Sequence, residues 1–197
     1  MRNMHKLMKN RLALSTVITT LIILVVSVLL AGVVTYFAIN VVSTRVQQES
    51  LSVSSLSVWV DSAGQSQAAI LITNTGGRDV VINQIQIRGI AATISHTGEV
   101  YSQLNVGGAV PNSLSAEATI AAANVFGAGD TTTSLALPAA GVSELVLTSG
   151  STMAVYIADP TGIGVHDIGT TIGLTVFTSQ AMYYQEANVQ TTTTVLP

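Results

Sequence analysis

The fold is decided by residues 12–44, LALSTVITTLIILVVSVLLAGVVTYFAINVVST, a stretch without one charged side chain. A short basic segment, residues 1–11, precedes it and holds four of the seven cationic residues of the chain. A helix needs about 20 apolar residues to cross the hydrocarbon core of a bilayer. As a helix, residues 12–44 would extend roughly 50 Å, at about 1.5 Å per residue. A simple membrane anchor does not require this excess length, whereas a helix that packs beside copies of itself does.

The polar residues of this stretch are compatible with an apolar environment. Most of them are short hydroxyls that can donate a hydrogen bond back to the helix backbone. They are Ser15, Thr16, Thr19, Thr20, Ser27 and Thr35. Ala31 and Gly32 permit another helix to approach closely. Because cations precede the apolar stretch and few follow it, the N-terminus is expected in the cytoplasm and the rest of the chain outside.

A cleaved secretory signal peptide is the first alternative for this N-terminus. Its apolar region would cover about 7 to 15 residues and would end at a cleavage site of small residues. The apolar stretch here is more than twice that length, and no A-x-A-like site closes it. We therefore expect a helix that remains part of the working protein.

The composition argues against several functional classes. The net charge is −3, but behind residue 11 only Arg45, Arg78 and Arg88 are basic, while all ten acidic residues remain. Three scattered arginines cannot form the basic patch that binds DNA or RNA. The chain has no cysteine, which excludes disulfides and thiolate chemistry. Only 9% of residues are charged, against about 25% in typical soluble domains, which favours a protein in an assembly or outside the cell.

Beyond residue 50 the apolar pattern changes to a period of two, which is typical of half-buried strands. The alternating sets are Leu56, Val58 and Val60; Ile85 and Ile87; Met153, Val155 and Ile157; and Ile172, Leu174 and Val176. Turn residues such as Asn74-Thr75-Gly76-Gly77 separate these sets. Many short strands with such turns predict an antiparallel β-sandwich. We expect residues 115–125 to be irregular or a strand, and residues 191–194 to be an edge strand or a tail.

The N-terminal part of the chain resembles archaeal type IV pilins. In that family a short basic leader precedes an apolar helix that opens with a stretch like residues 13–22, ALSTVITTLI. The resemblance continues in the head, where residues 70–77, ILITNTGG, followed by residues 81–89, are similar to a "strand, N-x-G turn, strand" unit of the immunoglobulin-like heads of archaeal pilins and archaellins. Residues 171–189 are similar to their closing strands.

The resemblance implies a division of the chain into three parts. Residues 1–11 would be a leader removed by a prepilin peptidase, residues 12–50 the apolar helix, and residues 51–197 an immunoglobulin-like antiparallel β-sandwich head. The fold class is therefore α+β. The residues implied in leader processing are Lys9, Arg11, Leu12, Ala13 and Leu14, with cleavage either before Leu12 or after Ala13.

The helix would span the membrane before assembly and form the filament core afterwards. The positions implied in the core are Val17, Leu21, Leu24, Val25, Val28, Ala31, Gly32 and Tyr36. The partners would be identical subunits, the prepilin peptidase and a membrane assembly platform. Bacterial type IV pilins carry a glutamate near the start of the mature helix, and its absence here favours the archaeal variety.

The expected function is that of a structural subunit of an extracellular pilus on the cell surface, used for adhesion, with a precursor in the cytoplasmic membrane. One alternative is a binding module: a single β-sandwich ectodomain held by an uncleaved anchor. Another is an archaellin of a motility filament, which shares the architecture. A membrane-tethered hydrolase ranks last, because Ser143 and Glu144 beside Gly141 do not form a G-x-S-x-G elbow.

Candidate metal ligands are sparse. His96 and His166 fall in predicted loops and would need a carboxylate such as Asp159 or Asp167 to form a metal site or a catalytic dyad. Asp159 and Asp130 would be candidates for calcium, but their spacing is not that of an EF-hand. We expect no enzyme activity, metal or cofactor.

The aromatic residues of the head have two interpretations. A sugar-binding platform is one, and packing in the core or on a sheet face is the favoured one. These residues are Trp59, Tyr101, Tyr156, Tyr183 and Tyr184. No N-x-S/T sequon occurs, so N-linked glycans are not expected, while the many Ser and Thr residues leave O-linked modification open.

Overall fold

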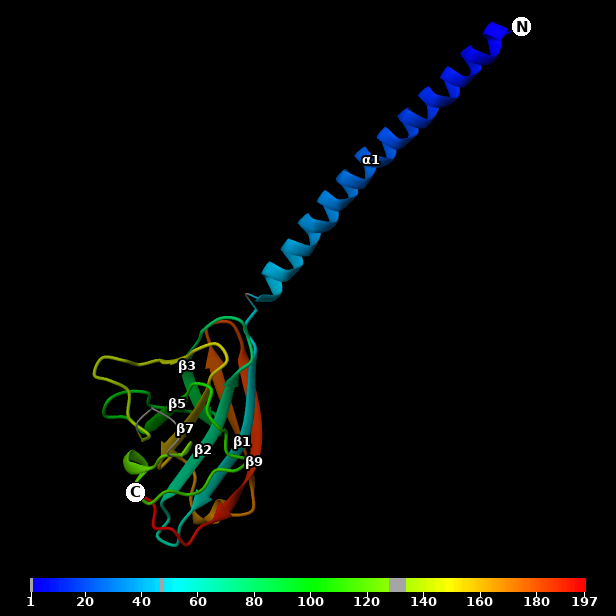
Figure 1. The fold of residues 1–197 in the computed structure, drawn as a ribbon. Coiled ribbons are helices and arrows are strands. Elements are labelled where there is room, and N and C mark those ends of the chain that lie inside the picture. Colours follow the sequence, from blue (N-terminus) through cyan, green and yellow to red (C-terminus); the bar gives the residue numbers. More distant parts are fainter. Residues whose placement is uncertain (1, 47, 128–133) are drawn as a thin grey trace. The chain divides into compact units, whose positions relative to one another are not determined.

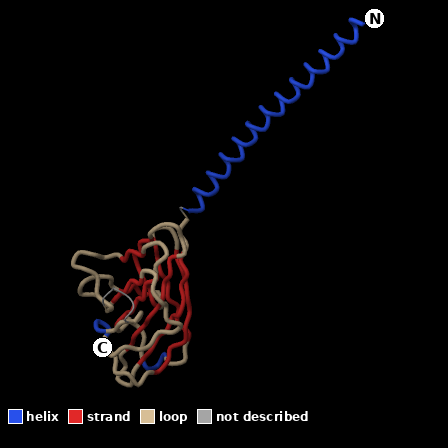
Figure 2. Tube along the Cα trace, in the orientation of Figure 1, coloured by secondary structure: helices blue, strands red, loops and turns tan. Residues whose placement is uncertain are grey.

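The chain consists of one long helix and one β domain. The computed structural model describes the backbone of residues 2–46, 48–127 and 134–197, and the side chains of these residues except 2–13, 45 and 46. Contacts divide the chain into two compact units, Met1–Val46 and Gln47–Pro197. The first unit is the helix α1 (Arg2–Val46), and the second is built of strands (Figures 1 and 2). The predicted order of an apolar helix followed by a β-rich head is confirmed.

The strands of the head form a curled, mostly antiparallel sheet. They are β1 (Leu51–Val60), β2 (Ser66–Asn74), β3 (Val80–Ile87), β4 (Ile90–Ala92), β5 (Val100–Asn105), β6 (Leu145–Leu147), β7 (Thr152–Ala158), β8 (Thr171–Thr178) and β9 (Met182–Thr191). Hydrogen bonds join them in the order β4-β3-β8-β9-β1-β2-β7-β5, and β6 pairs with β3. Two short 3-10 helices, η1 (Ile120–Ala122) and η2 (Val165–Asp167), lie in the connections.

The halves of the sheet are linked by one short parallel pairing. Strands β1 and β9 pair between Val58 and Val189 and over the next two positions, whereas the other paired strands run antiparallel. This pairing makes the sheet continuous through β9 and β1. An immunoglobulin-like sandwich of two separate sheets is therefore not confirmed, although the antiparallel character of the head is.

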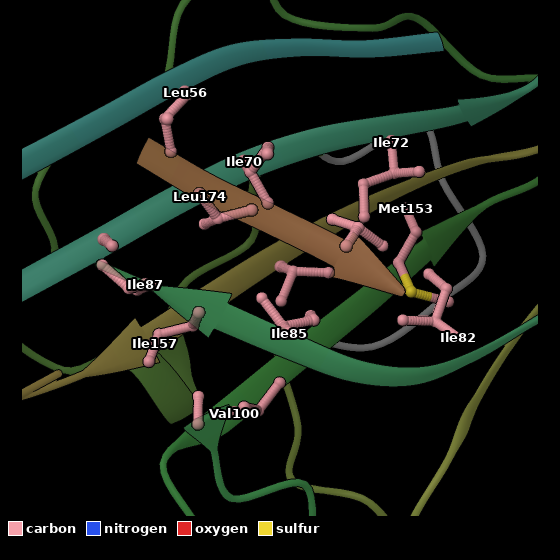
Figure 3. Close-up of a cluster of buried hydrophobic side chains, with 14 of the residues drawn as sticks. Leu56, Ile70, Ile72, Ile82, Ile85, Ile87, Val100, Met153, Ile157 and Leu174 are labelled. Atoms are coloured by element: carbon pink, nitrogen blue, oxygen red, sulfur yellow. The ribbon is translucent and has the colours of Figure 1, made fainter. Parts of the chain in front are cut away.

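The main core lies inside the curl of the sheet. Every residue of the four alternating sets found in the sequence belongs to this one buried cluster. Figure 3 shows Ile70 and Ile72 of β2 together with Ile85 of β3 and Leu174 of β8. Strands that lie far apart in the sequence thus supply one core, because each turns its β-branched face inward.

A second buried cluster lies on the opposite face of β2 and β7. Both faces of these two strands are buried, which the expectation of half-buried strands missed. The cover comes from the connection between β5 and β6, described over residues 106–127 and 134–144, and from the C-terminal tail. The members of this cluster are Trp59, Ala69, Leu71, Leu114, Ile120, Phe126, Leu135, Ala154, Tyr156 and Leu196. Residues 115–125 are irregular apart from η1, in agreement with the sequence analysis.

The buried side chain of Asn74 organises one end of the head. Its Nδ2 atom donates to the carbonyl oxygens of Arg78 (2.8 Å) and Leu147 (3.1 Å), and its Oδ1 atom accepts from the N–H of Gly76 (2.9 Å). The backbone of Asn74 also pairs with the turn at Gly150 and Ser151. The side-chain amide therefore ties the β2–β3 turn to β6, and the backbone of the same residue ties it to the turn before β7.

We expect Asn74→Ala to destabilise the head by about 1–3 kcal/mol, because it leaves the buried carbonyl oxygen of Leu147 without the donor it has now. Urea unfolding of residues 48–197 measures the effect. The matched control is Asn83→Ala, at an exposed position of β3, which should stay within about 0.5 kcal/mol of the unaltered protein. Equal effects of the two substitutions would contradict this role of Asn74.

Asp61 fastens the C-terminal tail to the turn after β1. Its Oδ1 atom accepts from the N–H groups of Ala63 (2.8 Å) and Gln65 (3.0 Å), and its Oδ2 atom accepts from the N–H of Leu196 (3.1 Å). The bond from Leu196 is the largest of the effects that hold the pKa of the Asp61 carboxyl below its usual value. The unfolded chain therefore binds a proton at this residue more readily than the folded head does.

The sign of this shift gives a pH prediction. A carboxyl with a lowered pKa in the folded state stabilises the fold above its unfolded pKa, and this stabilisation is lost as the pH falls through the folded pKa. The urea midpoint of the unaltered head should therefore exceed that of Asp61→Asn at pH 7. The difference should shrink steadily from about pH 5 to pH 2. A difference that stays constant over this range would show that ionisation of Asp61 contributes nothing.

Candidate assembly helix

The helix α1 is apolar around its whole circumference. Large hydrophobic side chains between Leu14 and Val42 are exposed on every side of it, and Leu24, for example, is 64% exposed. A helix that is apolar all round is stable only inside a large core, in a membrane or among other helices. The span Leu14–Thr44 is unburied in the structure. It therefore requires surroundings that the chain by itself does not provide.

Six polar side chains of α1 bond to the backbone of their own helix. The hydroxyls of Thr19, Thr20, Ser27 and Thr35 donate to backbone carbonyl oxygens three or four residues earlier, at 2.6 to 2.9 Å. This confirms the expectation for these four residues. Asn40 and Thr44 make bonds of the same kind. Since the donors are already used, entry into an apolar environment costs the helix less than exposed hydroxyls would.

The length of α1 suits more than one environment. The span Leu14–Thr44 is long and apolar enough to cross a membrane. Its 31 residues extend roughly 46 Å at about 1.5 Å per residue, and the hydrocarbon core of a bilayer is about 30 Å thick. In a membrane, the surplus length of the helix is accommodated by tilting. Outside a membrane, the helix needs another apolar partner along its length.

The helix runs through both positions where the sequence suggests leader cleavage. The backbone is helical from Arg2 onward, so Arg11-Leu12 and Ala13-Leu14 lie inside one continuous element. Leu14 is exposed. The side chains of Lys9, Arg11, Leu12 and Ala13 lie outside the described part of the structure, and leader processing stays a prediction.

The eight residues named for the filament core all lie on α1 and are exposed. Val17, Leu21, Leu24 and Val28 recur every three or four residues and share one side of the helix. Other sides carry equally apolar residues such as Ile22, so no single stripe is singled out. A Cβ atom built on Gly32 would meet no other atom within 4 Å, so this glycine leaves an open notch on the helix surface.

The first residues of the head are fastened to it, which sequence reasoning missed. The carbonyl oxygen of Ser50 accepts from the N–H groups of Thr75 (2.9 Å) and Gly76 (3.1 Å), and the carboxylate of Glu49 accepts from the hydroxyl of Thr178. A Cβ atom on Gly76 would lie 3.0 Å from the carbonyl oxygen of Gln48. The glycine of the Asn-Thr-Gly turn was the available signal, because such a close backbone approach requires glycine.

The candidate metal ligands of the head do not converge. His96 and His166 are exposed. The carboxylate of Asp167 is engaged by the guanidinium of Arg88 at 2.7 Å, and this bond lowers the pKa of Asp167. No group of three or more possible metal ligands occurs among the described residues. Asp130, the other calcium candidate, lies outside them.

The aromatic residues are divided between core and surface. Trp59 and Tyr156 are buried in the second cluster, and Tyr101 packs against it. Tyr183 packs against the main core. Only Tyr184 of these five side chains is exposed. The expectation of core and sheet-face packing is thus confirmed for these four, and Tyr184, although exposed, lies against Gly173 on the outer face of the sheet.

Comparison with known proteins does not identify the chain. No protein-family model matches the sequence, and no curated protein matches it.

The division into two units predicts different behaviour for the head and for the full chain. Residues 48–197 contain both buried clusters and the Ser50 bonds, and we expect them to be soluble, monomeric and β-rich. The full chain should need detergent or lipid to stay dispersed. Light scattering and far-ultraviolet circular dichroism measure both properties. A helical spectrum for residues 48–197 would contradict the division.

Proposed function

We propose that this chain is a structural subunit of an extracellular filament resembling the archaeal type IV pilus. In the filament, α1 packs against copies of itself to form the core, and the β heads form the outer surface. Before assembly, α1 lies in the cytoplasmic membrane with the N-terminus in the cytoplasm. The partners are identical subunits, a prepilin peptidase and a membrane assembly platform.

The observation that carries the proposal is the exposed, uniformly apolar surface of α1. Burying one large apolar side chain yields about 1.5–3 kcal/mol. Such residues occupy every side of the helix over the span Leu14–Thr44. Neighbours on all sides bury such a helix completely, and a bundle of identical helices supplies them. A contact between copies that does not close on itself generates a helical filament of unlimited length.

The leader explains how one helix serves two environments. Arg2, Lys6, Lys9 and Arg11 hold the helix in the membrane by keeping its N-terminus in the cytoplasm. The same four cations would be buried without partners in a dry bundle, at a cost of several kcal/mol each. Their removal by cleavage before Leu12 or after Ala13 lets the helix leave the bilayer for the filament core.

The head suits the outside of a filament. It carries a polar surface with few charges and its own two cores. The heads therefore need no support from α1 to stay folded, and they present most of their surface to the medium. Adhesion to surfaces is the role that this arrangement serves.

The test uses protein sheared from the surface of cells that produce the unaltered chain or a variant. Intact mass and N-terminal sequencing should find a form that begins at Leu12 or Leu14 in a fraction of high molecular weight. Leu24→Glu should abolish this fraction, because each subunit would bury a carboxylate among apolar helices. Val106→Glu places the same charge on a head residue that is 67% exposed, and it should leave assembly intact.

Two results would overturn the proposal. Normal filaments from Leu24→Glu would remove α1 from the filament core. Full-length protein found only in membranes would instead indicate a single ectodomain held by an uncleaved anchor.

A further inference from the structure

The outer face of β2 and β7 is covered by the second buried cluster. The outer face of β3, β8 and β9 has no such cover among the described residues. Strand registers place its residues in rows across the three strands. One row holds Gln84, Phe177 and Met182, the next holds Gln86, Thr175 and Tyr184, and a third holds Gly173 and Glu186. Met182 is 70% exposed and Tyr184 is 61% exposed, while Phe177 is half-buried. The face therefore combines exposed apolar and aromatic side chains with few charges.

The ring of Tyr184 is held in one position. A Cβ atom built on Gly173 would clash with the hydroxyl oxygen of Tyr184 and lie 2.5 Å from Cε2 and 2.7 Å from Cζ, so this edge of the side chain lies against the glycine. The hydroxyl of Tyr184 donates to Oε1 of Glu186 at 2.7 Å. Glycine in a strand often marks a close approach of this kind. Gly173 and Glu186 thus position the ring, while Tyr184 stays 61% exposed to the medium.

We propose that this face binds a neutral, β-1,4-linked polysaccharide, with Tyr184 as the stacking platform. The apolar face of a hexopyranose ring fits an exposed aromatic ring, and the hydroxyls at its edge need hydrogen-bonding groups. Gln86, Thr175 and Glu186 provide such groups beside Tyr184. A ligand of this size is fixed by a few polar groups around an apolar surface.

The geometry of the face favours a flat, extended chain. Phe177 and Gly173 lie four residues apart on β8, which is about 13 Å at about 3.3 Å per residue. A ligand that contacts Phe177 and the Tyr184 ring over Gly173 must therefore span more than one sugar unit in an extended form. β-1,4-linked chains form flat ribbons, whereas helical α-linked chains cannot lie along both positions.

Charge argues against acidic polysaccharides. Glu186 is the one charged residue in the rows described above, and the cation nearest to them in the chain, Arg88, already binds Asp167. A sulfated or carboxylated chain would find a carboxylate and no free cation among these rows. The proposal concerns the head alone and does not depend on filament assembly.

The test measures binding of the full chain in a detergent without a sugar headgroup. Calorimetry measures the binding of two soluble probes, cellohexaose and chitohexaose. Pelleting assays measure binding to particles of cellulose and chitin. We expect at least one of the two oligosaccharides to bind, and Tyr184→Ala to weaken this binding at least tenfold. Met182→Ala, an exposed apolar change on the same face, should alter it less than threefold. Maltohexaose, which is α-linked, should bind at least tenfold more weakly than the preferred β-linked probe.

The remaining outcomes decide against the proposal. Absence of binding to both β-linked probes would show that Tyr184 serves only to cover Gly173. Equal losses from Tyr184→Ala and Met182→Ala, or self-association that depends on Tyr184, would indicate a contact between copies of the chain. If Tyr184→Ala fails to fold, Tyr184→Phe keeps the ring and loses the Glu186 bond. Binding by this variant should fall by less than fivefold, and its complete loss would remove the ring from the site.

Discussion

The constraint on which the rest of the structure depends is the burial of a helix that has no polar side. Most helices of soluble proteins bury one stripe and present the opposite side to water. On α1 the large side chains between Leu14 and Thr44 are apolar in every direction, and hydroxyls such as those of Thr19 and Ser27 bond to the backbone. Such a helix is stable only where water is absent on all sides. A membrane meets this requirement, and so does a bundle of identical helices.

The head answers a different requirement, since it must fold without the helix. It does so with two apolar layers, one inside the curl of the sheet and one on the outer face of β2 and β7. The bonds of Asn74 and Asp61 then fasten turns and the C-terminal tail to these layers. The outer face of β3, β8 and β9 stays uncovered, which is why the candidate binding surface lies there.

The sequence was sufficient to predict the elements that depend on local periodicity. The helix followed from the apolar stretch, and the inward faces of β1, β3, β7 and β8 followed from alternation, because side chains on a strand point to opposite faces. The second cluster could not be foreseen. Its cover comes from Leu114, Phe126 and other residues of a connection without a period of its own, and only tertiary contacts place that connection over β2 and β7.

The same distinction holds for the candidate sites. The eight positions named for the filament core are exposed on one helix. Their place in a filament core stays a prediction, and the sequence does not choose among the sides of the helix. The seating of Tyr184 on Gly173 depends on the register of β8 with β9, and register is fixed by long-range pairing. The immunoglobulin-like arrangement is not confirmed for a related reason. The parallel pairing of β1 with β9 joins the first and the last strand of the head in sequence order.

The most direct test of the filament core is electron cryo-microscopy of the protein sheared from the cell surface. The account predicts filaments with α1 helices packed side by side around the axis and β heads on the outside. Filaments in which heads form the axis and the helices lie elsewhere would contradict it. So would a sheared fraction without filaments, with all of the protein remaining as single chains in the membrane.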